Sequence, residues 1–204
     1  MPELELSRRE RKKEETKERI FHAAFTLFKA HGVEETTIGE ICAKADVAKG
    51  TFFNYFPQKQ AVFGYLAEQW FTQAEAQAAE ILARPGPAAP QLVAMFAELA
   101  AFYEQEAALA KYVIHESMRA QHTGTDEMCL RWDELGLRLV RRLQATGELR
   151  SDEDSRRLMD IIHAVHQGTI LQYVESPSPP FPLRAELRRR LTLVVEGLMP
   201  RGGA

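Results

Sequence analysis

Two proline-rich segments divide the chain and limit where its helices can run. One covers residues 84–90 and the other covers residues 176–182. Because proline lacks an amide hydrogen and its ring clashes with the preceding turn, we expect neither segment to continue a helix. Elsewhere the apolar residues recur at helical spacing, with no alternating run long enough for a strand and no internal repeat. The sequence therefore predicts an all-α protein.

The helix boundaries follow from apolar spacing and from local capping residues. Gly32 and Gly147 can each end a helix, because glycine tolerates the conformation of a C-terminal cap. Thr37 and Glu40 form a capping box, in which each side chain satisfies a free amide of the first turn. The predicted helices cover about 9–31, 37–45, 49–55, 58–83, 92–102, 109–118, 128–143, 152–174 and 183–198, the eighth starting at Ser151 or Asp152.

Composition favours an ordinary globular protein. The chain has 204 residues, of which 45% are apolar and 27% charged, and its formal net charge is −3. No apolar run approaches the roughly 18 residues of a membrane-spanning helix, and the first residues lack the apolar stretch of a secretion signal. We therefore expect a cytoplasmic protein with no membrane partner. Cys42 and Cys129 lack the spacing of a zinc site, so we expect both to be buried apolar residues.

Residues 37–59 have the spacing of a helix-turn-helix. A short capped helix is followed by a tight turn and by a second short helix, 49–55. In that motif the second helix enters the major groove of DNA, so its approach surface must be small and its tips polar or aromatic. Gly50 lets the backbone approach a phosphate, Lys49 supplies a charge, and Asn54 can hydrogen-bond an adenine edge at two atoms. We therefore expect this segment to read double-stranded DNA.

A basic run at residues 8–13 leaves two interpretations open. It contains five arginine and lysine residues, but Glu10, Glu14 and Glu15 lie within or beside it. Such a pattern is typical of a solvated helix face with ion pairs between successive turns. The alternative is an arm that contacts DNA.

Residues 36–41 and 48–59 resemble the N-terminal signature of the TetR (tetracycline-repressor) family, and the match extends over about 16–63. The resemblance implies a three-helix DNA-binding domain, 1–57. It also implies that a roughly six-helix domain, 58–204, binds a ligand and pairs two subunits. The protein would thus be a transcriptional regulator rather than an enzyme, working as a homodimer and without a cofactor.

The resemblance also implies roles for single residues. Thr37 would contact a phosphate from the start of its helix, and Lys59 matches the phosphate-binding lysine at the start of the family's fourth helix. The other DNA-contacting positions lie on the recognition helix and are Lys49, Gly50, Thr51, Phe53, Asn54 and Tyr55.

Three positions depart from the family's common pattern. Asp46 stands where glycine is usual, which is tolerable because aspartate accepts the left-handed conformation better than most residues. Ala48 replaces a common serine and loses one helix cap, and Phe53 replaces a frequent tyrosine and loses a hydroxyl. The base preference of the family therefore does not transfer to this chain.

Candidate effector-binding residues are large or half-polar side chains on helices that have an apolar face elsewhere. Few of them are charged, so we expect a mainly apolar ligand with a small polar end. They are Phe96, Tyr103, Tyr112, His115, Met118, Trp132, His163, His166, Gln167 and Tyr173. The alternative for each is an ordinary core residue.

Gly168 suggests how two subunits pair. A glycine inside a helix costs roughly 1 kcal/mol relative to alanine, so close approach of a partner helix would explain it. With the narrow Leu/Val stripe of the last helix, this predicts a homodimer through the last two helices. The alternative is that the stripe closes the core of a single subunit.

The sequence favours a repressor that a small molecule releases from a near-palindromic operator. Two alternatives remain: a DNA-binding dimer that needs no ligand, and a metal-dependent enzyme that uses His163 and His166, which share a helix face. No cysteine or carboxylate joins these histidines at ligand spacing, so we expect no metal site.

Overall fold

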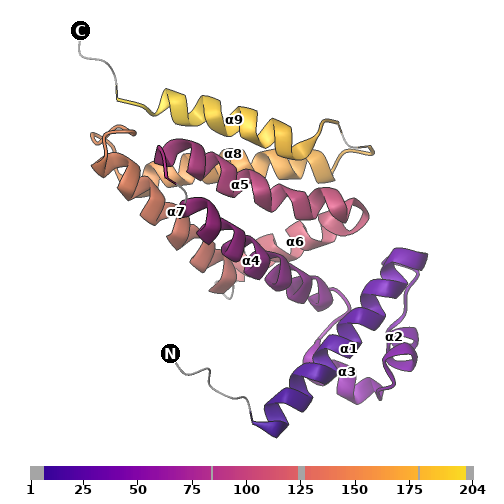
Figure 1. Ribbon diagram of the computed structural model, residues 1–204. Helices are drawn as coiled ribbons and strands as arrows, with labels where there is room; N and C mark the ends of the chain where they lie inside the picture. The colour runs from indigo at the N-terminus through magenta and orange to yellow at the C-terminus, as the bar shows by residue number, and fades with distance from the viewer. Residues whose placement is uncertain (1–6, 84, 124–126, 179, 201–204) are drawn as a thin grey trace. The chain divides into compact units, whose positions relative to one another are not determined.

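Figure 1 shows the computed structural model of the chain, whose secondary structure is helical throughout the described residues. These are 7–83, 85–123, 127–178 and 180–200, apart from the side chains of residues 99, 120–123, 127–129 and 132. The all-α prediction is confirmed. The helices are α1 (Arg8–His31), α2 (Ile38–Ala45), α3 (Lys49–Tyr55), α4 (Ala61–Leu82), α5 (Ala88–Gln105), α6 (Ala107–Thr123), α7 (Glu127–Ala145), α8 (Ser155–Val174) and α9 (Leu183–Gly197).

Several helix ends lie where the sequence predicts them. The amide of Gly32 donates to the carbonyl of Phe28, and Gly32 has a φ of 86°, which favours glycine. Gly147 has a φ of 74° just after α7. The capping box of Thr37 and Glu40 is present at the start of α2.

Other helix starts differ from the prediction, in each case for a local reason. The start of α1 has its own capping box, in which Ser7 and Glu10 satisfy each other's amides. The cap of α8 is Asp154, whose carboxylate accepts from the amides of Arg156 and Arg157. The earlier start at Asp152 fails, because the carboxylate of Asp152 is bound by the Arg150 guanidinium.

The starts of α4 and α5 also differ. Residues 58–60 form tight turns in place of the first turn of α4, with the amide of Phe63 donating to the carbonyl of Gln60. α5 begins at Ala88, inside the proline-rich segment, so Pro90 lies in its first turn. A proline is tolerated there because the first amides of a helix have no partner within it.

The chain folds as two compact units, residues 1–66 and 67–204. The division falls inside α4 and later than the expected boundary after residue 57, because the first residues of α4 pack within the N-terminal unit. The Phe63 ring stacks on Phe28 with centroids 5.1 Å apart, and the edge of Tyr65 meets Phe21 at 5.1 Å. Within this unit, α1 packs on α2 and α2 on α3.

The C-terminal unit is a helical bundle in which α9 lies along α5 and α8 (Figure 1). α7 packs on α5 and α8, and α6 packs on the same two helices. Trp70 of α4 stacks on Phe102 of α5 with centroids 5.9 Å apart and meets the edge of Tyr103 at 5.4 Å. Each helix contributes buried apolar residues, including Ile81, Leu92, Leu109, Leu143, Leu158 and Leu187. No helix among the described residues is long and apolar enough to cross a membrane.

Candidate functional site

The start of α2 is held by reciprocal hydrogen bonds between Thr37 and Glu40. The Glu40 amide donates to Thr37 Oγ1 at 3.2 Å, and the Thr37 amide donates to Glu40 Oε2 at 2.8 Å. Thr37 Oγ1 also donates to this carboxylate oxygen at 2.8 Å. These bonds from the Thr37 backbone and hydroxyl lower the pKa of Glu40. Thr37 itself is exposed, so its helix end is open to solvent.

The turn between α2 and α3 has the geometry of a helix-turn-helix. Asp46 adopts the left-handed conformation, with a φ of 52° and a ψ of 55°, and its amide caps the end of α2. Ala48 precedes α3 in an extended conformation, with a φ of −72° and a ψ of 153°, and provides no side-chain cap. Asp46 therefore substitutes for glycine in this turn, and α3 begins without the cap that a serine would provide.

α3 has one anchored side and one exposed side. Phe52 is fully buried, and the edge of its ring meets Phe53 at 5.6 Å between centroids. Phe53, in contrast, is 49% exposed, and Lys49 and Asn54 are exposed as well. The short helix therefore presents charged, amide and aromatic groups to solvent while its buried side holds its orientation.

The other residues of α3 differ in their exposure. Gly50 is exposed, and no atom lies within 4 Å of the position that a Cβ would occupy. Thr51 and Tyr55 are half-buried. A backbone or phosphate can therefore approach most closely at Gly50, near the start of α3.

The Lys59 side chain makes its hydrogen bonds within the N-terminal unit. Its Nζ donates to the carbonyls of Val33 at 2.6 Å, Thr36 at 2.8 Å and Glu34 at 3.4 Å. All three carbonyls belong to the loop between α1 and α2. The side chain thus joins the turn before α4 to the segment that carries Thr37, and its ammonium group is engaged within the protein.

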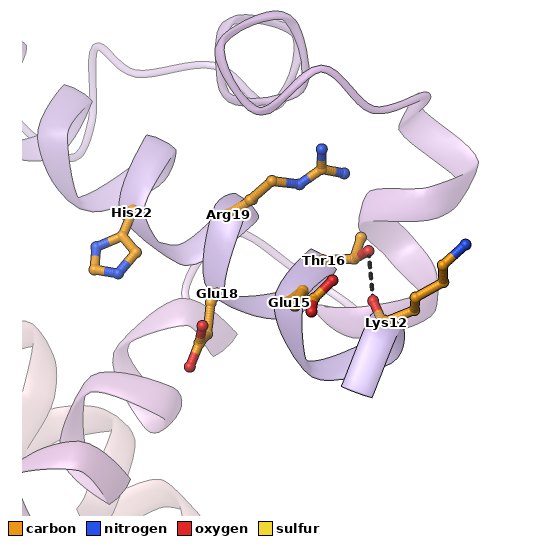
Figure 2. Close-up of a pocket in the computed structure, with 6 residues that line it drawn as sticks. All are labelled: Lys12, Glu15, Thr16, Glu18, Arg19 and His22. Atoms are coloured by element: carbon orange, nitrogen blue, oxygen red, sulfur yellow. Dashed lines mark hydrogen bonds between the residues drawn. The ribbon is translucent and has the colours of Figure 1, made fainter. Parts of the chain in front are cut away.

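A hollow runs along the exposed side of α1 (Figure 2). The hydroxyl of Thr16 donates to the carbonyl of Lys12 at 2.8 Å, a bond within the helix. Both acidic and basic side chains line the hollow, and none is buried. Its lining residues are Lys12, Glu15, Thr16, Glu18, Arg19 and His22. This open surface lacks the enclosed apolar wall of a small-molecule site.

Four of the candidate effector residues lie in the core of the C-terminal unit: Phe96, Tyr103, His166 and Tyr173. The ring centroids of Phe96 and His166 are 5.1 Å apart, so the structure brings these two candidates together. Tyr103 packs instead on Trp70, and Tyr173 faces Phe181 with centroids 6.2 Å apart.

The other candidates are less enclosed. Tyr112, Met118, His163 and Gln167 are half-buried. His115 is exposed, and its Nε2 lies 2.6 Å from Glu175 Oε1, so it joins α6 to the end of α8 on the surface. The side chains of Trp132 and Cys129 lie outside the described residues, whereas Cys42 is buried, as expected.

His166 is the polar candidate with the most unusual surroundings. It is 4% exposed, and its Nε2 has no hydrogen-bond partner. Burial, reinforced by neighbouring His163, lowers the pKa of His166 to about 3, although a hydrogen bond to the backbone of Phe96 opposes this shift. Burial also lowers the pKa of His163. The His166 imidazole is therefore neutral near pH 7.

Two neighbours of this region escape the sequence prediction. A Cβ added to Gly136 of α7 would lie 2.6 Å from Met159 Cε and 3.4 Å from Phe96 Cζ, so this glycine lets two side chains approach the α7 backbone. Ser117 is buried, and its Oγ has no hydrogen-bond partner. Its spacing of four residues from Val113 was the available signal, since it places a hydroxyl on the apolar side of α6.

The outer side of α8 and α9 carries exposed apolar residues. Ile161 of α8 is 42% exposed and Leu193 of α9 is 61% exposed. Gly168 is also exposed, and no atom lies within 4 Å of the position of an added Cβ. Packing within the described part of one subunit therefore does not explain this glycine. Among the described residues, no group of three or more histidine, cysteine or acidic side chains could hold a metal ion.

Comparison with known proteins places these observations in a family. The sequence model of the bacterial regulatory proteins of the tetR family matches residues 20–66, which contain α2 and α3. The chain is 25% identical over 178 residues to the HTH-type transcriptional repressor DhaR of Mycobacterium sp. (strain GP1), and this covers 85% of the chain and 87% of DhaR.

Solved structures share the whole fold. The TetR-family repressor FadR of Thermus thermophilus, in complex with lauroyl-CoA, superposes with a TM-score of 0.76 at 29% identity, over 92% of this chain and 97% of that one. FadR of Bacillus subtilis, in complex with stearoyl-CoA, has a TM-score of 0.67 at 18% identity, over 89% and 98% of the two chains. The second likeness concerns the fold alone.

Proposed function

This chain is a member of the tetR family of bacterial regulatory proteins, and we propose that it is a dimeric repressor that a mainly apolar effector releases from DNA. The observation that carries DNA reading is the two-sided α3. Phe52 is fully buried, whereas Lys49, Gly50 and Asn54 of the same short helix are exposed. The family has a regulatory function, and the protein would act in the cytoplasm, where its DNA is accessible.

The DNA contacts divide into two kinds. Lys49 and the Gly50 backbone would position α3 on phosphates, and Thr37 would do so from the start of α2. Asn54 would read a base edge, while Thr51, Phe53 and Tyr55 would add contacts to phosphates or to thymine methyl groups. Phosphate contacts carry no sequence information, so base preference would depend chiefly on Asn54 and its neighbours.

The outer side of α8 and α9 supports dimerisation. Exposed Ile161 and Leu193 would be covered by a second subunit, and Gly168 would allow its helices to approach closely. A dimer with twofold symmetry places two recognition helices in successive major grooves, about 34–36 Å apart on a near-palindromic operator. In this mechanism, residues 1–57 would read DNA, and residues 58–204 would bind the effector and pair the two subunits.

The effector would bind in the core of the C-terminal unit, near Phe96 and His166. The apolar character of this region and the likeness to a repressor that binds lauroyl-CoA support a ligand with a long apolar chain. Release from DNA would be a population shift, so the ligand must bind the released conformation more tightly than the DNA-competent one. Tyr103, Tyr173 and the half-buried Tyr112, Met118, His163 and Gln167 are further candidates for the walls of this site.

DNA reading is tested by identifying the operator and then altering α3. Fragments of genomic DNA that the protein retains would define the operator, and competition with unrelated DNA would measure specificity. We expect Lys49→Ala to weaken binding to all sequences and to lower the salt dependence of the binding constant by about one counterion. Asn54→Ala should instead reduce the preference for the operator over unrelated DNA, by about 1–3 kcal/mol.

The matched control is Lys29→Ala, which removes another exposed lysine of the same unit, in the last turn of α1. This control should leave both the salt slope and the specificity unchanged. If Lys49→Ala behaves like the control, Lys49 does not contact phosphate. If Asn54→Ala weakens operator and unrelated DNA equally, Asn54 reads no base.

A further inference from the structure

The core of the C-terminal unit contains buried polar atoms that the protein does not satisfy. Nε2 of His166 and Oγ of Ser117 are both buried and have no hydrogen-bond partner. They belong to α8 and α6, which pack against each other. Buried polar groups in folded proteins nearly always have a partner, so an unsatisfied one requires an explanation, such as a bound molecule. The serine hydroxyl can both donate and accept, and the histidine is therefore the more informative of the two.

The hydrogen bonding of His166 defines which of its two nitrogens can accept. The ring is hydrogen-bonded to the backbone of Phe96, and because Nε2 has no partner, the nitrogen involved is Nδ1. A backbone carbonyl only accepts, so Nδ1 carries the ring hydrogen and donates it. In a neutral imidazole the other nitrogen then has a free lone pair. Nε2 is therefore an acceptor, and the low pKa keeps it one at cytoplasmic pH.

The surroundings of this acceptor are apolar. The Phe96 ring faces the imidazole at an angle of 63°, and Ile162 and Ile170, one turn away on either side along α8, are both buried. Met159 is also buried and lies beside Phe96 at the Gly136 backbone. A polar group that enters this region must bring its own donor, since the described protein atoms offer none to Nε2.

We propose that Nε2 of His166 accepts a hydrogen bond from a hydroxyl group carried by an otherwise apolar effector. This inference rests on the proposed effector function and specifies its chemistry. A hydroxyl is the smallest donor that fits an apolar environment, and it leaves the rest of the ligand free to pack on Phe96 and Met159. An ionised carboxylate has only acceptors, so it would leave Nε2 unsatisfied and bury a charge.

The experiment compares molecules that differ by one hydroxyl. The probes are lauroyl-CoA and a set of lauroyl-CoA derivatives with a single hydroxyl at different carbons of the chain. Their binding to the full-length protein is measured by calorimetry, and release from the operator is measured in parallel. For one hydroxyl position we expect binding about twofold to tenfold tighter than that of lauroyl-CoA, the gain of one net hydrogen bond.

Two variants of His166 separate this role from a structural one. His166→Asn keeps a donor near the Nδ1 position and removes the Nε2 acceptor, so the preference for the hydroxylated probe should disappear. His166→Gln keeps a polar group near the Nε2 position and should retain part of the preference. Operator binding of both variants is also measured in the absence of probe, so that a general loss of function is distinguished from a lost preference for the hydroxyl.

Nitrogen NMR of histidine-labelled protein gives a readout that does not depend on affinity. The Nε2 resonance of ligand-free protein should have the shift of an unprotonated nitrogen without a hydrogen bond, and it should move towards that of a hydrogen-bonded acceptor when the preferred probe is added. A resonance that already shows a hydrogen bond in the free protein would mean that a resident water occupies the site, and the proposal would be wrong.

The remaining outcomes are also decisive. Equal affinity for lauroyl-CoA and all its hydroxylated derivatives overturns the inference while leaving an acyl-type effector intact. A preference that persists in His166→Asn assigns the hydroxyl to another residue and overturns it as well. If no probe binds, both the inference and the acyl-type effector fail, whereas loss of operator binding is a separate failure that concerns the DNA-reading function.

Discussion

Lys59 brings one positive charge to three backbone carbonyls of the loop before α2. The ammonium group has three hydrogens, and the carbonyls of Val33, Glu34 and Thr36 lie within 3.4 Å of it. A long side chain with four rotatable bonds can reach several partners. The sequence alone therefore does not show which partner Lys59 binds. In this structure Lys59 stabilises the segment that carries Thr37, and its effect on DNA binding would be indirect.

Replacing Lys59 by methionine separates these two roles. Lys59→Met should lower the free energy of unfolding by about 1–3 kcal/mol, because the partly buried carbonyls of Val33 and Thr36 lose a charged donor while the apolar stem is kept. The salt dependence of DNA binding should stay as in the wild type. Urea denaturation and binding titrations at several salt concentrations check the two expectations. A salt slope that falls by about one would instead show that Lys59 also contacts a phosphate.

The depressed pKa of His166 predicts a pH dependence of stability. The folded-state pKa is about 3, below the value of 6.5 for an unperturbed histidine, so the unfolded chain binds more protons between these two pH values. The contribution of His166 is therefore fully present above about pH 6.5 and is lost as the pH falls, by up to about 1.4 kcal/mol per pH unit. Half-buried His163, whose pKa is lowered too, adds to this slope.

Urea denaturation at a series of pH values between about 5 and 7 measures this slope. The His166→Asn variant serves as the control, because it lacks the titrating group and should show a shallower dependence. An equal slope in both proteins would mean that His166 does not titrate differently in the folded and unfolded states.

Among the helices, α3 depends most on its neighbours. It has seven residues, and its first residue follows Ala48, which offers no side-chain cap. Helices this short are not stable alone, so α3 depends on the burial of Phe52 and Phe56. The extended conformation of Ala48 is the one that a capping serine adopts.

Ala48→Ser should therefore stabilise the N-terminal unit by about 0.5–1 kcal/mol, through a hydrogen bond to a free amide in the first turn of α3. The control is Ala43→Ser, which introduces the same side chain at an exposed position inside α2. Serine is a weaker helix former than alanine, so the control should destabilise slightly. Chemical denaturation of both variants tests the difference, and equal effects would show that position 48 provides no cap.

Helix ends were predictable where the capping interaction is local. Gly32, and Thr37 with Glu40, act within one turn, so their roles are visible in the sequence. The start of α8 was ambiguous, because Ser151, Asp152 and Asp154 are all good caps. Asp154 takes the role here, and the ion pair between Arg150 and Asp152 is a competing interaction that propensity does not reveal.

For the whole molecule, DNA reading and effector binding differ in how much the sequence reveals. The helix-turn-helix is formed by consecutive residues, so the sequence alone was enough to predict it. The C-terminal unit is built from contacts between distant helices, and the meeting of Phe96 with His166 depends on the packing of α5 against α8. Helical periodicity marks which residues are apolar, but not which helices meet, and Ser117 and Gly136 consequently escaped prediction.

Gly168 tests the assembly of two subunits. In an isolated subunit, Gly168→Ala should raise the free energy of unfolding by up to about 1 kcal/mol, since alanine favours the helix and the added methyl meets no atom within 4 Å. In a dimer with closely packed α8 helices, the same methyl should clash and weaken association. Sedimentation over a range of protein concentrations measures the dimer, and thermal unfolding at high dilution measures the subunit. Unchanged association would exclude Gly168 from the dimer interface.

The position of Trp70, which stacks on Phe102 within the C-terminal unit, has an optical consequence. The chain has two tryptophans, Trp70 and Trp132, and both belong to the C-terminal unit, residues 67–204. Intrinsic tryptophan emission is therefore blind to the N-terminal unit, whereas far-ultraviolet dichroism records the helices of both. Thermal unfolding followed by both signals would therefore distinguish the two units without a label. A transition that dichroism records and tryptophan emission does not would come from the N-terminal unit, which reads DNA.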